Sequence, residues 1–207
     1  MKLITHKINQ NSNTSKAIVA LHGWTGDEFV FDPIAKMLNI KQAQWFIPRA
    51  PYKADNQNGN TWFGGNEKSG WRYKKTMTGL EYLVDDIIQE GYSKENIFIL
   101  GFSQGATLAI EFGLRLPFSI GGIIPIAGFI KFKIKLIEEN SPASLKTKIL
   151  LLHGSDDKIV PVNESYTSLD LLKGMGYKAT LEEYKAGHKI PISCHRFIHK
   201  FIRFHGT

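Results

Sequence analysis

The chain has 207 residues, of which 43% are hydrophobic and 22% are charged, and its formal net charge is +7. A chain of this size buries roughly 70% of its unfolded surface, so we expect one globular domain over residues 1–207. The Lys and Arg residues are scattered without long blocks, so the charge does not predict a nucleic-acid partner. A single cysteine, Cys194, excludes an intrachain disulfide and suits a reducing compartment.

Neither the first residues nor the longest apolar stretch of the sequence predicts a membrane-inserted segment. The first residues lack an apolar core of signal-peptide length, and the apolar stretch 120–130 is too short and too glycine-rich to span a bilayer. We therefore expect a cytoplasmic protein without stable membrane insertion. The C-terminal segment 191–204 is basic and amphipathic, and we expect it to pack on a sheet rather than rest on a membrane surface.

Short β-rich runs alternate with helical patterns along the chain, which is typical of a mostly parallel sheet with helices on both faces. The expected strands are 17–21, 44–47, 97–101, 121–127, 149–153 and 179–184, with 2–8 as an antiparallel edge. The expected helices are 29–38, 78–90, 103–116, 163–175 and 191–204. Residues 51–77 form one long polar, glycine-rich connection, and a long loop in a compact domain is more often functional than accidental.

The segment Gly-Phe-Ser-Gln-Gly at 101–105 matches G-x-S-x-G and lies between an expected strand and an expected helix. In such a turn the serine adopts a sparsely populated backbone conformation that exposes its hydroxyl, and larger residues at Gly101 and Gly105 would clash. A plain Gly-Ser turn is the alternative. The expected helix after the motif has small residues at Gly105, Ala109 and Gly113. Because an expected strand, a sharp turn and this helix follow one another, we predict that Ser103 is a nucleophile.

A serine hydroxyl needs a base, and seven histidines compete for that role. His22 and His153 each precede a glycine at a strand end, where an imidazole more often braces a loop. His195 and His199 lie one helical turn apart, but no third zinc ligand is near, so solvated or packing side chains are expected. His188 follows the last strand, at the strand end where parallel sheets build their sites, and it is the predicted base.

The orienting acid is expected in the loop after the strand at 149–153, where Asp156 and Asp157 both stand. Spacing alone does not separate them, and turn formation or helix capping is the alternative role. An oxyanion site needs two backbone N–H groups. The residue after the nucleophile, Gln104, supplies one, and Trp24 in the loop "LHGWTGDEF" is the natural second donor.

With "LHGWTGD", "GFSQGA", "LLHGSDDKIVP" and "AGHKIP" in this order, the chain resembles the phospholipase/carboxylesterase family of α/β-hydrolases, which includes acyl-protein thioesterases. The resemblance covers nearly the whole length and implies an α/β-hydrolase fold. It implies Ser103 as nucleophile, Asp157 rather than Asp156 as acid, and His188 as base. It also implies that the backbones of Trp24 and Gln104 bind the oxyanion.

The chain departs from the family pattern in two places. The first loop reads H-G-W-T-G-D, one residue longer than the usual H-G-L-G-D. Gly64 stands where an acid usually follows Trp-Phe, so the geometry of the acyl pocket is expected to differ from that of family thioesterases.

Aromatic side chains in the long loop and after a later strand are candidates for a substrate pocket, because acyl groups bind in apolar clefts. The expected pocket residues are Trp62, Phe63, Trp71 and Phe129. Plugging the core is the alternative role of such aromatics. Residues 128–137, which alternate apolar side chains with Lys just beyond a strand end, are a second candidate stretch for this pocket; a solvated strand face is the alternative.

These features together predict a serine hydrolase that cleaves small-molecule carboxylic esters or acyl thioesters through an acyl-enzyme, as a monomer or homodimer. No cofactor and no metal is expected. A peptidase or an acyltransferase would use the same residues. A non-catalytic small-molecule binding protein on a hydrolase scaffold is the remaining alternative, disfavoured because every catalytic position holds a competent residue.

Overall fold

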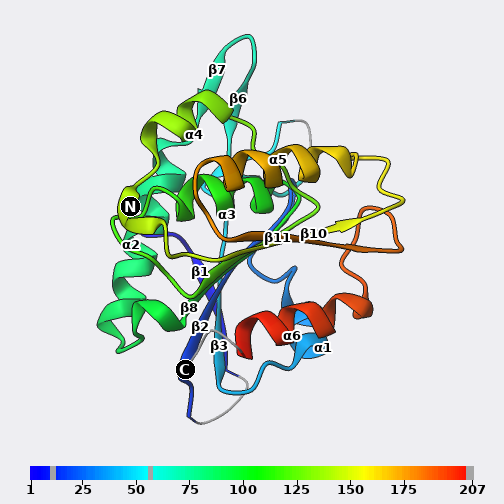
Figure 1. Cartoon of the computed structure of the whole chain (residues 1–207). Helices are drawn as coiled ribbons and strands as arrows, with labels where there is room; N and C mark the ends of the chain where they lie inside the picture. The colour runs from blue at the N-terminus through cyan, green and yellow to red at the C-terminus, as the bar shows by residue number, and fades with distance from the viewer. Residues whose placement is uncertain (10–12, 56–57, 204–207) are drawn as a thin grey trace.

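The computed structural model describes residues 1–9, 13–55 and 58–203. At its centre lies a seven-stranded sheet in the order β1-β3-β2-β8-β9-β10-β11 (Figure 1). Its strands are β1 (Thr5–Asn9), β2 (Lys16–Leu21), β3 (Ala43–Pro48), β8 (Ile97–Phe102), β9 (Gly122–Ile126), β10 (Ile149–Gly154) and β11 (Ala179–Tyr184). Edge strand β1 pairs antiparallel with β3, and every other neighbouring pair is parallel. The predicted mostly parallel sheet with an antiparallel edge is confirmed.

The central strands are continuous apolar runs because helices cover both faces of the sheet. Every residue of β9 and β10 is buried, and β2 is buried from Ala17 onward. The alternate residues Ala17, Val19 and Leu21 belong to one core, whereas Ile18 and Ala20 belong to the other. Strand periodicity thus divides one sequence run between two hydrophobic cores.

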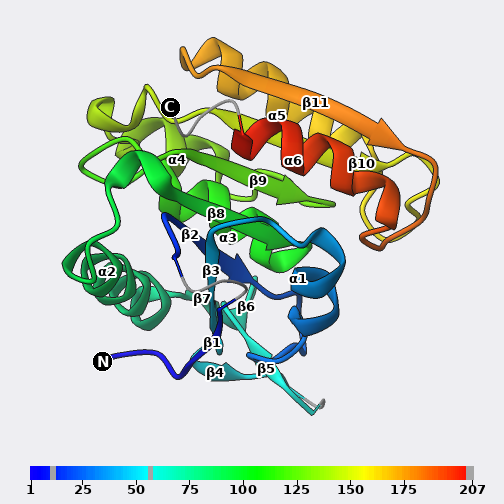
Figure 2. The same ribbon diagram turned by 90° about the horizontal axis from the view of Figure 1, so that it is seen from below.

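Six α-helices complete the layers. They are α1 (Asp32–Leu38), α2 (Lys74–Gln89), α3 (Gln104–Gly113), α4 (Lys133–Glu139), α5 (Asn163–Gly174) and α6 (His195–Arg203) among the described residues. Helices α1 and α6 cover one face of the sheet, and α2, α3 and α5 cover the other (Figures 1 and 2). Helix α6 buries Ile198, Phe201 and Ile202, as expected for a terminal helix that packs on the sheet, while Phe204 lies outside the described residues.

The long connection at 51–77 has more structure than expected. It contains the paired strands β4 (Tyr52–Lys53) and β5 (Asn60–Thr61), followed by the hairpin of β6 (Gly64–Asn66) and β7 (Gly70–Arg72). Helix α2 begins at Lys74 instead of 78, and the expected helix at 29–38 begins at Asp32. In Figure 1 the β6–β7 hairpin projects beyond the helical layer, next to α4.

The alternating stretch 128–137 is not a strand face, so that alternative was wrong. Ala127 adopts a left-handed backbone conformation with φ 54°, and the chain leaves the sheet after β9. After a short connection the chain forms the helix α4, in which Leu136 is the buried side chain. Alternation over so few residues does not distinguish a strand from a helix with one buried position.

No helix in the described part of the chain is long and apolar enough to cross a membrane.

Candidate active site

Ser103 lies in the sharp turn between β8 and α3, with φ 54° and ψ −118°. Few non-glycine residues adopt such a conformation, and surrounding contacts must maintain it. The Ser103 N–H donates to the carbonyl of Ile126 at 2.9 Å, and its own carbonyl accepts from Ala106 and Thr107 in the first turn of α3. The backbone of Ser103 is therefore fixed to both neighbouring elements.

The two glycines of the motif are required by close backbone approach. A side chain on Gly101 would overlap the backbone of Gly105, and a side chain on Gly105 would overlap the carbonyls of Leu21 and His22. The elbow thus packs directly on the end of β2, where the loop that contains Trp24 begins. The predicted clash at these positions is confirmed.

His188 and Asp157 form a hydrogen-bonded pair at the carboxyl ends of β11 and β10. His188 Nδ1 lies 2.7 Å from Asp157 Oδ2. Asp157 Oδ1 accepts the N–H groups of Ile159 and Val160, each at 2.9 Å. Asp156 is exposed, so the structure brings Asp157 rather than Asp156 to the histidine.

The surroundings of Asp157 favour its ionised form. Burial acts to raise the pKa of this carboxyl, but hydrogen bonds from Val160 N–H, His188 and Ile159 N–H outweigh it and lower the pKa. Asp157 therefore stays a carboxylate able to hold His188 Nδ1 in its protonated form. The loop after β10 is also held by His153, which was expected to brace a loop. His153 contacts the carbonyl of Val160 at 2.8 Å and the Ser165 hydroxyl at 2.6 Å.

The pair lies next to the elbow. The His188 ring contacts the ring of Phe102, the residue before Ser103, with centroids 4.9 Å apart. The Ser103 hydroxyl makes no hydrogen bond with His188 among the described residues. In hydrolases without bound substrate this contact is commonly long and tightens only in the complex.

The loop after β2 approaches the elbow at Gly23. A Cβ placed there would lie 3.6 Å from Ser103 Cβ. Thr25, with φ 66°, bonds through its N–H to the carbonyl of Asn60, and Gly26 N–H bonds to the carbonyl of Gly23. The intervening N–H of Trp24 has no hydrogen-bond acceptor among the described residues, nor has that of Gln104, whereas the Trp24 side chain is exposed. Both predicted oxyanion donors are thus available on the backbone.

Two further residues position this loop: His22, which was predicted to brace a loop, and Trp62, which was not. His22 is fully buried; its Nδ1 lies 2.7 Å from the carbonyl of Gly23, and its Nε2 accepts the N–H of Ala50. Trp62 Nε1 donates to the carbonyl of His22 at 2.8 Å, and Trp62 N–H donates to Gln104 Oε1 at 2.9 Å. These long-range contacts have no local sequence signature.

Trp62, expected in the substrate pocket, is instead a core residue, because its side chain is fully buried and engaged by His22. The other three pocket candidates line a cavity of about 170 Å³ that also contains Ser103. The lining residues are Phe63, Trp71, Ser103, Gln104, Thr107, Phe129, Lys131 and Val160. Phe129 and Lys131 both belong to the stretch 128–137, the second candidate for the pocket.

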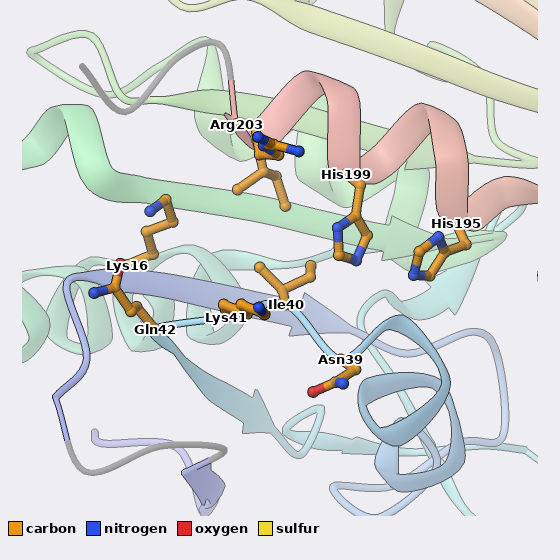
Figure 3. A pocket seen from close by; sticks show the side chains of 9 residues that line it. Lys16, Asn39, Ile40, Lys41, Gln42, His195, His199 and Arg203 are labelled. Carbon is orange, nitrogen blue, oxygen red and sulfur yellow. The ribbon is translucent and has the colours of Figure 1, made fainter.

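The pair His195 and His199 lies on the α6 side of the sheet, beside a pocket of about 640 Å³ (Figure 3). The two rings stack with centroids 3.9 Å apart, and His199 Nε2 contacts the carbonyl of Leu38. Within residues 1–9, 13–55 and 58–203, no group of three or more His, Cys, Asp or Glu side chains could hold a metal ion. The stacked rings and the contact of His199 with Leu38 agree with the expected packing role of these histidines.

The sequence profile of the phospholipase/carboxylesterase family matches residues 5–206. The chain belongs to this family. Carboxylesterase SOBER1 of Arabidopsis thaliana is 27% identical over 202 residues, which cover 90% of this chain and 89% of that protein. Acyl-protein thioesterase 1 of Gibberella zeae is 31% identical over 185 residues, 81% of this chain and 77% of that protein.

The crystal structure of esterase PE8 superimposes on this chain with a TM-score of 0.85 at 28% identity. The superposition covers 99% of this chain and 100% of the esterase chain. Another relative, from Oryza sativa, carries the name "Probable inactive carboxylesterase" and is 24% identical over 213 residues, 93% of this chain and 87% of that protein. Family membership makes this chain an esterase- or thioesterase-type hydrolase with the α/β-hydrolase fold. The predicted family and fold are confirmed.

Proposed function

We propose that the protein is a serine hydrolase that cleaves carboxylic esters or thioesters of short acyl groups through a Ser103–His188–Asp157 triad. The observation that supports this most directly is the buried Asp157 bound to His188, whose ring packs beside the strained Ser103 turn. Ser103, Asp157 and His188 all follow the carboxyl ends of strands of the same sheet, which supports their action as nucleophile, orienting acid and base.

In acylation, Ser103 Oγ attacks the carbonyl carbon while His188 Nε2 takes the hydroxyl proton. Asp157 holds the proton on Nδ1 and stabilises the imidazolium. The negative charge that develops on the carbonyl oxygen is met by the N–H groups of Trp24 and Gln104. When the carbonyl re-forms, the bond to the leaving oxygen or sulfur breaks, and Nε2 returns the proton to the leaving alcohol or thiol.

In deacylation, water attacks the acyl-enzyme and gives its proton to His188 Nε2. The same two N–H groups stabilise the second oxyanion. Collapse releases the carboxylic acid, and His188 returns the proton to Ser103 Oγ. The net reaction consumes one water and needs no electron acceptor or donor.

The cavity supports a short acyl group. Its volume of about 170 Å³ lies below the range of roughly 300–1,000 Å³ that is usual for drug-sized ligands. Phe63, Trp71 and Phe129 make most of its wall apolar. A small, mainly apolar space beside the nucleophile favours acyl chains of a few carbons over long fatty acyl chains.

Intact mass after treatment with a fluorophosphonate tests the proposal. We expect a single adduct on the native protein, no adduct on Ser103→Ala and strongly slowed labelling of His188→Ala. His195→Gln, which removes a histidine on the far side of the sheet, serves as control and labels like the native protein. Absence of an adduct on the folded native protein would overturn the proposal and favour the non-catalytic binding alternative.

Burial of Cys194, the single cysteine of the sequence, should prevent a side reaction of its thiol in this experiment. Cys194 is fully buried, and burial raises the pKa of its thiol to about 12. A thiol in that state is a poor nucleophile. Cys194 should therefore not compete with Ser103 for the reagent.

A further inference from the structure

Among the described residues that line the cavity beside Ser103, Lys131 is the one that is charged. It lies in the connection between β9 and α4 and is half-buried. Its Nζ lies 4.3 Å from the centroid of the Trp71 ring and 5.9 Å from that of Phe132. The cation is therefore held against an aromatic wall of the same cavity.

The Lys131 ammonium has no carboxylate partner in the part of the chain that the structure describes. Two other cations of this region are paired: Arg115 contacts Glu111 and Glu139, and Lys135 contacts Glu139 at 3.6 Å. Aromatic faces stabilise a cation but leave its charge uncompensated. An unpaired cation in a largely apolar cavity attracts an anion that enters with the substrate.

The position of this charge limits where that anion can be. The carbonyl carbon of the substrate must lie at Ser103, and the acyl group must fit in about 170 Å³. Phe63, Trp71 and Phe129 present apolar surface in the same cavity. The lining accordingly suits a few methylene groups followed by a negative charge.

We propose that Lys131 binds a carboxylate at the far end of a short acyl group, so that the preferred substrates are monoesters or monothioesters of short dicarboxylic acids. The proposal rests on the proposed hydrolase function and specifies its substrate class. The net charge of +7 also favours the approach of anionic substrates. The alternative is that Lys131 only packs on Trp71 and closes the cavity wall.

The ratio of two kcat/KM values separates these roles. The substrates are mono-p-nitrophenyl glutarate and p-nitrophenyl pentanoate, which differ in a carboxylate or a methyl group at the end of the same chain. The rate in buffer is subtracted, because the free carboxylate can attack its own ester. We expect the native protein to favour the glutarate about tenfold, as for a charge-assisted pair that is partly exposed to solvent.

In Lys131→Met the ratio should fall to about one, and Lys131→Arg should retain most of the preference because it keeps the charge. Lys133→Met removes an exposed lysine of the same region and should keep the native ratio. Circular dichroism and the rate of fluorophosphonate labelling report whether each variant is folded with an active serine.

Two results would overturn the proposal: a native ratio near one, or a ratio unchanged in Lys131→Met even if both activities fall. The second result would assign Lys131 to packing of the wall. Failure of the hydrolase function itself looks different, since neither ester would be hydrolysed and Ser103 would not be labelled.

Discussion

Asp157 Oδ2 lies 2.7 Å from His188 Nδ1, and the Asp157 side chain is fully buried. Its neighbour Asp156 is exposed. Two adjacent carboxylates in one loop therefore have different surroundings. Substitution of Asp156 is accordingly a matched control for substitution of Asp157. The relationship gives Asp157 one task in the proposed mechanism, which is to keep the proton of His188 on Nδ1.

Asp157→Asn should lower kcat by about 10⁴, because an amide no longer selects the correct imidazole tautomer or stabilises the imidazolium. Asp156→Asn should change kcat less than about twofold, since its side chain is exposed and forms no hydrogen bond or ion pair with His188. Steady-state hydrolysis of a p-nitrophenyl ester measures both. Equal effects of the two substitutions would remove Asp157 from the triad.

His22 should make the free energy of unfolding depend on pH. Burial lowers the pKa of this imidazole below its ordinary 6.5, against the raising effects of Gly23, Asp27 and Glu28. The unfolded chain then binds more protons than the folded chain, so stability falls as pH drops below 6.5 and through the lowered folded pKa. The slope from one such group is at most about 1.4 kcal/mol per pH unit.

Replacing His22 by Gln should remove this contribution, because Gln does not titrate. Urea unfolding between about pH 8 and pH 5 should show a smaller pH dependence for His22→Gln than for the native protein. The variant should also have a lower kcat, since the Gly23–Gly26 loop loses the contact that orients the Trp24 N–H. His195→Gln is the control; identical pH curves for all three proteins would contradict the prediction.

The sequence predicts best what is local. Strands β2, β8 and β10 are recognisable because they are unbroken apolar runs. The elbow is recognisable because Gly101, Ser103 and Gly105 fall within one turn. The sequence predicts worst what depends on distant partners. Helix α4 has one buried position, Leu136, which leaves too weak a pattern to separate it from a strand.

The same limit explains the error at Trp62. An aromatic residue in a long loop serves equally well as a pocket wall or as a core plug. The choice depends on the carbonyl of His22 and the amide of Gln104, which lie far away in sequence. Phe63, the next residue, faces the cavity, so adjacent residues of one extended segment serve the two roles.

Trp71 lines two neighbouring pockets, and its removal should change the acyl-chain preference of the enzyme. It lines both the cavity of Ser103 and a groove of about 920 Å³ between the β6–β7 hairpin, α2 and α4. Trp71→Ala should join them and raise kcat/KM for p-nitrophenyl decanoate relative to butyrate by about tenfold. Trp24→Ala, which removes an exposed indole but keeps the backbone N–H, should leave the ratio unchanged.

A chain-length profile from acetate to decanoate provides the measurement. An unchanged profile in Trp71→Ala would mean that Trp71 does not limit the cavity. Because Trp71 also contacts Lys131, the glutarate preference of this variant reports whether the cation keeps its place without the indole.

Arg115 should be essential for stability because it compensates a buried charge. Its Nη1 lies 2.7 Å from Glu111 Oε2, and the Glu111 side chain is only 4% exposed. Burial raises the pKa of Glu111 overall, although Arg115 acts to lower it. Glu111 Oε1 also accepts the N–H of Phe132, whose ring packs against Phe63 in the cavity wall.

Arg115→Met should lower the free energy of unfolding by about 3–5 kcal/mol, since it leaves the Glu111 carboxylate buried without its cation. Removing the exposed partner in Glu139→Gln should cost less than about 1 kcal/mol. The Arg115→Met penalty should shrink as pH falls, because protonation neutralises a buried carboxyl whose folded pKa is raised. Urea unfolding at several pH values measures these effects, and a pH-independent penalty no larger than that of Glu139→Gln would show that Glu111 does not need Arg115.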